Sequence, residues 1–302
     1  MVNRDGLRSL YTQIAARYEA DVIPVFAPLA ADFAEWIGAC SAAYLDGTLD
    51  DPFAMEETRI SPTMQQRLMA MNALDIGTGT GILARTLATT FQSVVGVDLS
   101  AAMLAAAPPN PRTTLIAGDV HQLPFRANAF RLAVSSFGLN TTTPKQSLRS
   151  VTRVLRPNGG LLFLQEWGAL DDLARAADDL LRERQPSDFE IPDEALRAFL
   201  SEDSPWYAQL SDADDYFDSL KRLGYQQVWA REAAFVNVEV SIETFIRYKL
   251  AWPSRRLPYL AMSADQRSAF DAKFREHVQR YSHDGQHVIW SPPLIRAFAV
   301  KG

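Results

Sequence analysis

The chain has 302 residues, of which 47% are hydrophobic and 22% charged, values typical of a globular protein with one large or two ordinary domains. The formal net charge of −6 argues against nucleic acid as a partner, because phosphates require a basic surface. The single cysteine excludes an internal disulfide, and no apolar run approaches the length of about 20 residues that spans a membrane. No signal peptide is visible, so we expect a cytoplasmic protein without a membrane span.

The N-terminal part of the chain has a helical pattern. Residues 7–40 repeat apolar side chains at helical spacing, and Pro28 fits the first turn of a second helix. Residues 46–63 combine glycine and prolines with acidic side chains, which is typical of a connection. We therefore interpret residues 1–70 as an N-terminal helical cap segment.

The middle of the chain alternates short apolar runs with helical segments. The apolar runs are residues 73–76, 94–97, 114–116, 132–135 and 161–164. The helical segments are residues 81–90, 100–106 and 144–155. This alternation predicts parallel strands joined by crossover helices, and residues 71–168 form the expected α/β core.

The last third of the chain continues with helices and then strands. Residues 169–222 are helical and acidic, and we interpret them as an insertion over the carboxyl ends of the strands. Residues 223–302 supply the last strands, at 225–238, 288–290 and 294–300, and further helices at 241–250 and 263–281. The fold class expected is a doubly wound, mostly parallel α/β sheet with a helical cap.

A glycine-rich turn follows the first apolar run of the core. The segment is Asp75-Ile76-Gly77-Thr78-Gly79-Thr80-Gly81, and alternating glycines allow positive φ and close approach of a ligand to the backbone. Asp98 ends the next apolar run, 17 residues after Gly81. An acidic residue about 20 residues beyond such a turn commonly binds a ribose diol. Residues 79–84 also satisfy GxGxxA, so a dinucleotide and S-adenosyl-L-methionine (SAM) both remain possible ligands.

Five segments in order resemble the motifs of class I SAM-dependent methyltransferases. They are Asp75–Gly81, Val94–Ser100 followed by Met103-Leu104, Ala117–Phe125, Phe130–Asn140, and Val154–Gly160 with Leu161–Glu166. The match covers roughly residues 70–167 and is nearest to the subgroup with the ubiquinone and menaquinone C-methyltransferases. The resemblance implies a seven-stranded, Rossmann-like methyltransferase fold with SAM as cofactor.

The resemblance also implies a set of cofactor-binding residues. The glycine turn would contact the methionine and ribose parts, and Asp75 would orient this turn or accept from the cofactor's ammonium. Asp98 would accept from the ribose hydroxyls, and Asp119 and Val120 would contact the adenine. Tyr11 and Tyr18 match a Tyr-x-x-Ile-Ala-x-x-Tyr segment that covers the cofactor in the subgroup. The full set is Tyr11, Tyr18, Asp75, Gly77, Thr78, Gly79, Asp98, Leu99, Met103, Asp119, Val120, Ser136 and Phe137.

The acceptor side of the site is predicted from composition. The cap segments add aromatic side chains, namely Trp36, Phe189, Phe199, Trp206, Tyr207, Phe245, Tyr248, Trp252 and Tyr259, with Trp167, Trp252 and Tyr259 as candidate pocket walls. They favour a mostly apolar, closable pocket and a small, largely hydrophobic or aromatic organic acceptor. No histidine is assigned as catalytic, and no metal site is expected. The alternatives are an NAD(P)-dependent oxidoreductase and a non-catalytic SAM-binding regulatory protein.

Overall fold

The computed structural model describes residues 3–54 and 60–302, and the chain forms two compact units made of discontinuous segments. The helical unit comprises Met1–Leu29, Ala169–Asp203 and Ala234–Pro293. The sheet unit comprises Ala30–Gly168, Ser204–Ala233 and Leu294–Gly302.

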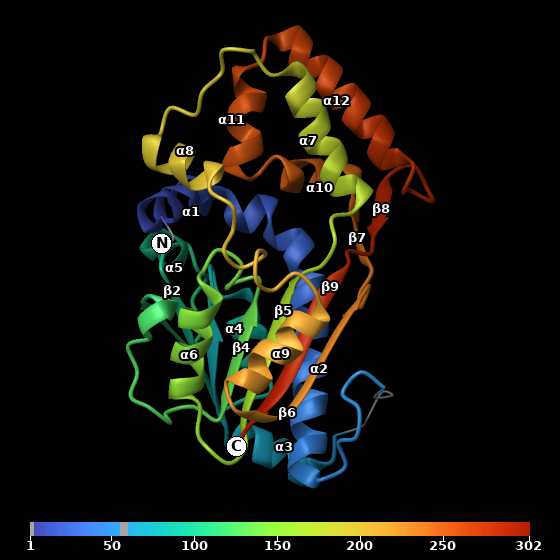
Figure 1. Ribbon diagram of the computed structural model, residues 1–302. Helices are drawn as coiled ribbons and strands as arrows, with labels where there is room; N and C mark the ends of the chain where they lie inside the picture. Colours follow the sequence, from blue (N-terminus) through green and yellow to red (C-terminus); the bar gives the residue numbers. More distant parts are fainter. Residues whose placement is uncertain (1–2, 55–59) are drawn as a thin grey trace. The chain divides into compact units, whose positions relative to one another are not determined.

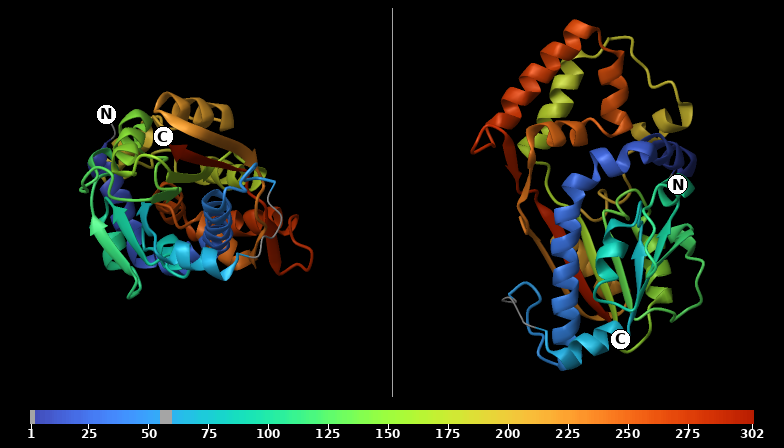
Figure 2. Two further views of the ribbon diagram at one scale, coloured as in Figure 1. Left: turned by 90° about the horizontal axis from the view of Figure 1, so that it is seen from below. Right: turned by 180° about the vertical axis from the view of Figure 1, so that it is seen from behind.

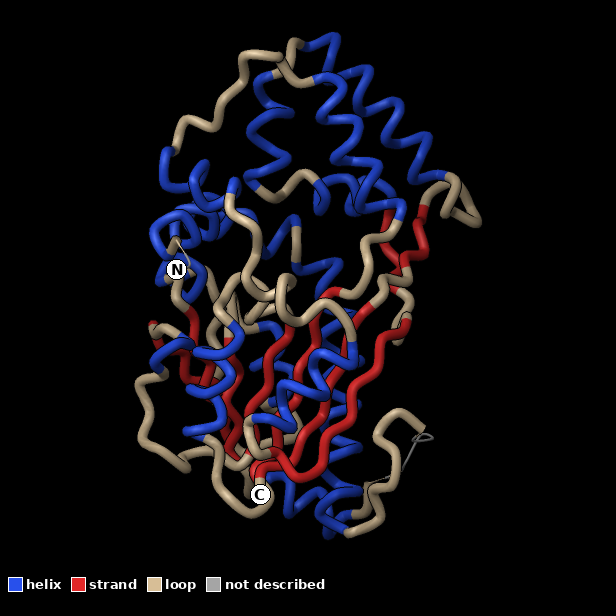
Figure 3. The backbone as a smooth tube through the Cα atoms, viewed as in Figure 1, coloured by secondary structure: helices blue, strands red, loops and turns tan. Residues whose placement is uncertain are grey.

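The sheet unit is built on a seven-stranded sheet with the strand order β3-β2-β1-β4-β5-β9-β6 (Figures 1 and 3). Its parallel strands are β1 (Asn72–Ile76), β2 (Ser93–Asp98), β3 (Thr113–Ala117), β4 (Leu132–Ser136) and β5 (Gly160–Trp167). β9 (Leu294–Lys301) lies antiparallel between β5 and β6 (Tyr225–Ala233). The predicted mostly parallel, seven-stranded α/β sheet is thereby confirmed.

Helices cover both faces of this sheet (Figure 2). One face packs against α3 (Pro62–Met69), α4 (Ile82–Leu87) and the part of α2 (Ile23–Asp46) that follows Leu29. There Phe33 and Ile37 are buried with Phe163 and Phe298 of the strands. The opposite face packs against α6 (Pro144–Val154) and α9 (Ala213–Arg222). The short helix α5 (Ala101–Ala105) and the 3₁₀ turn η1 (Val120–Gln122) follow β2 and β3.

The helical unit contains six complete helices among its described residues. They are α1 (Arg4–Asp21), α7 (Asp172–Arg184), α8 (Glu194–Ser201), α10 (Ile242–Lys249), α11 (Pro253–Ala261) and α12 (Ala264–Gln279). The strands β7 (Val238–Ser241) and β8 (His287–Trp290) pair with each other in a separate two-stranded sheet. Tyr11 and Tyr18 both contact Trp252 edge-to-face, with ring centroids 6.5 Å apart in each pair.

The compact units divide after Gly168, where the sequence also predicts a boundary, but not at the predicted residues 70 and 222. The first unit boundary falls within α2, because the apolar side chains after Leu29 belong to the sheet core. α9, predicted in the insertion, belongs to the sheet unit, because Tyr216 and Leu220 are buried in that core. Pro28 lies inside α2 instead of in its first turn, because the helix already begins at Ile23.

Two aromatic residues expected near the acceptor are core residues instead. Trp206 is fully buried in the sheet unit and donates its indole N–H to the Tyr216 hydroxyl at 2.8 Å. Trp36 stacks between Phe33 and Phe53 and meets Phe163 edge-on. Both rings pack in the sheet core, and the sequence alone does not show which strands they contact.

Among the described helices, α2 passes a test of length and hydropathy for a membrane span. Half of its most apolar window is buried within the protein.

Candidate functional site

The glycine turn between β1 and α4 brings backbone to the carboxyl end of the sheet. Gly77 and Gly79 have φ values of 70° and 57°, and Gly81, the N-cap residue of α4, has a φ of 81°. The Gly77 and Thr78 amides both donate to the Val97 carbonyl, at 2.8 and 3.1 Å. A Cβ on Gly77 would lie 2.4 Å from the Gly138 Cα, so this turn has room only for glycine.

Asp75, near the end of β1, contacts the glycine turn through a buried hydrogen bond. Its carboxylate is 2% exposed and accepts a hydrogen bond from the Thr78 hydroxyl at 2.6 Å. Burial raises the pKa of Asp75 to about 7. The Thr80 hydroxyl is also buried and makes no hydrogen bond within the described residues. The geometry suits the loop-orienting role that the resemblance implies for Asp75, and the contact with the cofactor's ammonium stays a prediction.

Asp98 connects the end of β2 to the same turn. One carboxylate oxygen accepts from the Gly79 amide and the other from the Ser100 amide, both at 2.8 Å. Each oxygen keeps a second lone pair, so the carboxylate can still accept from a diol. Burial raises the pKa of Asp98, although its side chain remains half-buried. Next to it, Leu99 is half-buried, while Met103 is buried with its methyl 3.4 Å from where a Gly79 Cβ would stand.

Asp119 and Val120 follow β3 at the η1 turn. The Asp119 carboxylate accepts from the backbone N–H of His121 and pairs with its Nδ1, both at 2.9 Å. The His121 Nε2 accepts from the Thr143 amide at 3.0 Å, which fixes the proton of the neutral ring on Nδ1. His121 therefore ties two loops together, as expected for a structural histidine.

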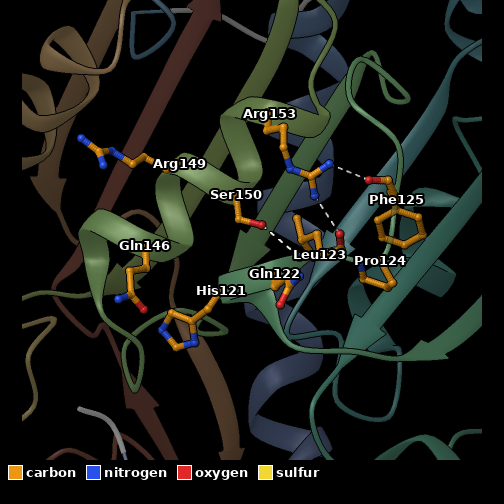
Figure 4. Close-up of a pocket in the computed structure, with 9 residues that line it drawn as sticks. All are labelled: His121, Gln122, Leu123, Pro124, Phe125, Gln146, Arg149, Ser150 and Arg153. Atoms are coloured by element: carbon orange, nitrogen blue, oxygen red, sulfur yellow. Dashed lines mark hydrogen bonds between the residues drawn. The ribbon is translucent and has the colours of Figure 1, made fainter.

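A cavity of about 630 Å³ lies between α6 and the η1 turn with the segment that follows it (Figure 4). Arg153 donates to the Leu123 and Phe125 carbonyls at 2.7 and 2.6 Å, and the Ser150 hydroxyl accepts from the Leu123 amide. These contacts fasten the segment after η1 to α6. None of the predicted cofactor residues lines this cavity.

The end of β4 presents an aromatic pair. Phe137 follows Ser136 with a φ of 59°, a conformation that non-glycine residues rarely adopt. Its ring stacks on Trp167, which ends β5, at a centroid distance of 4.0 Å. The Phe137 amide donates to the Gln165 carbonyl at 2.8 Å. The two strand ends thus hold a stacked ring pair, called the aromatic surface below, in which Phe137 is 9% exposed. The pair adjoins Gly138, which packs on Gly77 of the glycine turn.

A buried polar chain supports Ser136 from the α2 face of the sheet. Arg296 of β9 forms an ion pair with Asp32 of α2 and donates to the Gln165 side-chain oxygen at 2.8 Å. The Gln165 amide group in turn donates to the Ser136 hydroxyl at 3.0 Å. Arg296 is 3% exposed and also lies against the rings of Phe33 and Trp36. No sequence pattern predicts this chain of contacts, because its residues lie far apart in the chain.

Glu166 supports the loop that follows Ser136, from the other face of the sheet. Its carboxylate accepts from the Leu139 amide and from the Asn140 side-chain amide, both at 3.1 Å. Burial raises the pKa of Glu166 to about 8. Sequence reasoning gave Glu166 no role, although one signal was present. Gln165 and Glu166 are two polar residues in a strand whose preceding residues, 161–164, are all apolar.

The structure therefore brings together most of the predicted cofactor residues. Those of the sheet unit lie at or just beyond the carboxyl ends of β1 to β4, the edge where ligands bind in open α/β sheets. They are Asp75, Gly77, Thr78, Gly79, Asp98, Leu99, Met103, Asp119, Val120, Ser136 and Phe137. Tyr11 and Tyr18 belong to the helical unit, so their lid role stays a prediction. Among the described residues, no group of metal-ligating side chains could hold a metal ion.

Sequence comparison identifies the domain that this site belongs to. Residues 74–163 match the family model of the methyltransferase domain. The ubiquinone/menaquinone biosynthesis C-methyltransferase of Syntrophotalea carbinolica is 39% identical over 100 residues, covering 30% of this chain and 42% of that one. A demethylmenaquinone methyltransferase of Clavibacter sepedonicus is 27% identical over 186 residues, covering 60% and 69%.

The aligned part thus spans about two fifths of the first relative's length. Among solved structures, the YcgJ protein of Bacillus subtilis aligns with a TM-score of 0.47 and 17% identity, covering 79% of this chain and 96% of that one. The domain assignment rests on the sequence match over residues 74–163 and agrees with the observed strand order. With the ordered motifs and the glycine turn in place, residues 74–163 form a methyltransferase domain that is similar to the ubiquinone/menaquinone C-methyltransferases.

Proposed function

We propose that the protein is an active methyltransferase that moves the methyl group of SAM to a small, largely hydrophobic or aromatic acceptor. The observation that carries the proposal is the aromatic surface of Phe137 and Trp167 beside the glycine turn. The glycine turn and its neighbouring acidic residues suit an adenosyl ligand, and the ring pair of Phe137 and Trp167 suits a planar, apolar acceptor.

The residues of the cofactor half fit SAM on their own geometry. The turn at Gly77 and Gly79 admits close approach of a ligand, since side chains there would collide or strain the backbone. Asp98 keeps acceptor capacity for two ribose hydroxyls, and Asp119 would accept from the adenine amino group. When bound, SAM supplies a methyl group on a sulfonium, which is transferred in line to a nucleophile.

The protein's own contribution to transfer would be positioning. The positive charge of the donor disappears as its methyl moves, so a water-poor site lined by apolar side chains is compatible with the reaction. Phe137 and Trp167 would hold an aromatic acceptor by stacking or edge contact. The names of the two relatives indicate ring substrates of the quinone type, which supports an aromatic acceptor here.

Calorimetry tests the cofactor. Protein stripped of co-purifying ligand should bind SAM and S-adenosylhomocysteine (SAH) but not NADH. Asp98→Ala should weaken SAH binding by about 1–3 kcal/mol, because the ribose hydroxyls lose their acceptor. Binding of NADH with no response to SAH would remove the proposal, and unchanged SAH affinity in a folded variant would place the ribose elsewhere.

An acceptor screen tests the reaction. Methyl-labelled SAM is incubated with hydroxylated benzenes and naphthalenes, a short-chain demethylmenaquinol, a peptide pool and tRNA. We expect label in the aromatic compounds only. Label in peptide or RNA would contradict the acceptor class, and SAH binding with no labelled product from any source would favour a regulatory SAM-binding protein.

A further inference from the structure

We propose that Glu166 is a positioning residue of the acceptor side of the site, which fixes the loop of residues 137–140 between the aromatic surface and the glycine turn. The inference rests on the proposed function, since it assigns this loop to the site of methyl transfer. It adds a residue that binds neither cofactor nor acceptor but determines where Phe137 stands.

The contacts of Glu166 are concentrated on this loop. Its two carboxylate oxygens accept separately, one from the Leu139 amide and the other from the Asn140 side-chain amide. The same Asn140 amide group donates to the Phe137 carbonyl at 3.1 Å, so Glu166 is linked to Phe137 through one side chain. The Asn140 carbonyl accepts from the Ser204 hydroxyl at 2.6 Å. The loop is thus held at the Phe137 carbonyl, the Leu139 amide and the Asn140 carbonyl.

The loop needs such support because its conformation is unfavourable by itself. Phe137 has a positive φ, which costs a non-glycine residue about 1 kcal/mol or more. Gly138 packs directly on Gly77, where an added Cβ would meet backbone on both sides. Any movement of the loop would therefore shift both the aromatic surface and the glycine turn.

Glu166 is more than a buried packing group, because a carboxyl is a costly residue to place there. It is 1% exposed, and an apolar side chain at its position would cost no desolvation. Burial raises its pKa, while the N–H donors of the loop lower it, so the ionised carboxyl holds the loop more tightly than the protonated one. The titratable side chain facing it from the described part of α9 is Tyr216, whose own pKa lies well above its usual value.

Hydrogen exchange on the protein without ligand tests the contact directly. Glu166→Ala should speed the exchange of residues 137–142 by about tenfold, since two hydrogen bonds are lost, with no change in strands β1 and β2. Glu166→Gln, which keeps the shape, should have a smaller effect. Asn140→Ala provides a second variant if Glu166→Ala does not fold. Asp218→Asn, an exposed carboxylate of α9, is the matched control and should behave as the wild type.

The pH dependence separates positioning from simple loss of stability. A loop that opens locally withdraws its N–H donors and leaves the carboxyl buried, so the Glu166 pKa is higher in the open loop than its value of about 8 in the closed one. After correction for intrinsic rates, protection of residues 137–142 in the wild type should therefore rise as pH increases through about 8 and above, although global unfolding, which exposes the carboxyl to water, has the opposite dependence below about pH 8. Glu166→Gln should remove this rise. Unchanged exchange in Glu166→Ala, equal acceleration throughout the sheet, or a rise that persists in Glu166→Gln would each overturn the inference.

SAH binding connects the loop to the site. Glu166→Ala should bind SAH at least about fivefold more weakly than the Asp218→Asn control, because Gly138 would no longer support Gly77. Exchange that responds as expected together with unchanged SAH affinity would overturn the link to the site. If the wild-type protein binds no SAH, the proposed function fails, while the exchange measurements still decide the role of Glu166.

Discussion

Replacing Gly138 by alanine should damage both stability and cofactor binding. A Cβ on Gly138 would lie 2.3 Å from the Ile76 carbonyl oxygen and 2.8 Å from the Gly77 Cα, whereas ordinary contact begins at 3.4 Å. Backbone atoms cannot rotate away as a side chain can, so the two loops must separate by about 1 Å. Overpacking of this kind costs about 1–3 kcal/mol.

The measurement is thermal unfolding followed by SAH calorimetry. A loss of about 2 kcal/mol should lower Tm by about 4–8 °C for a unit of this size and move the glycine turn enough to weaken SAH. Gly224→Ala is the matched control, since Gly224 has a φ of 90° but no neighbour within 4 Å of its added Cβ. It should cost about 1–2 kcal/mol of strain and leave SAH affinity unchanged. Wild-type Tm and SAH affinity in Gly138→Ala would refute the packing argument.

Three further predictions concern buried ionisable side chains and a glycine of α2 that has space for a Cβ. Burial raises the pKa values of Asp75 and Glu166 to about 7 and 8, whereas both groups titrate near about pH 4 in the unfolded chain. The folded state therefore binds more protons than the unfolded state between these pH values, and the free energy of unfolding should fall as pH rises from about 4 to about 8. Urea unfolding from pH 5 to pH 8 should show a shallower fall in Asp75→Asn; an identical slope would argue against a protonated Asp75. Arg296→Met should lower the free energy of unfolding by about 2–4 kcal/mol, less than for a fully buried pair because the Asp32 side chain is 36% exposed; no change in urea midpoint would contradict a stabilising pair. Gly38→Ala should stabilise the sheet unit by about 0.5–1 kcal/mol, since the residue is helical and the nearest neighbour of its Cβ would be 3.7 Å away; a lower Tm would show hidden strain.

The sequence was sufficient for the parts of the fold that depend on local pattern. The apolar runs predicted all five parallel strands, and the glycine turn with Asp98 predicted the edge of the sheet where the site lies. Both signals are contained within short segments, so no knowledge of distant contacts was needed. α11 was missed because Pro253 and Pro258 count against a helix, although the first proline stands in its first turn.

The parts that could not be predicted depend on residues far apart in the chain. The polar chain joins Asp32 to Arg296, and each residue alone reads as an ordinary surface charge. Glu166 meets Asn140 only because β4 and β5 are neighbours and the loop after β4 turns back. The unit boundary inside α2 falls beside Pro28, but the helix continues through it, so the sequence shows no end of an element there.

The position of β9 has a consequence for synthesis on the ribosome. β9 lies between β5 and β6, yet residues 294–301 are translated after every other strand of the sheet. Until they emerge, β6 has no neighbour in that sheet, and one edge of β5 is unpaired. The nascent chain therefore exposes two adhesive strand edges during translation of the helical unit's last segment, Ala234–Pro293. Slow elongation of this segment would lengthen the time in which these edges can aggregate, and a chaperone that binds them would reduce aggregation.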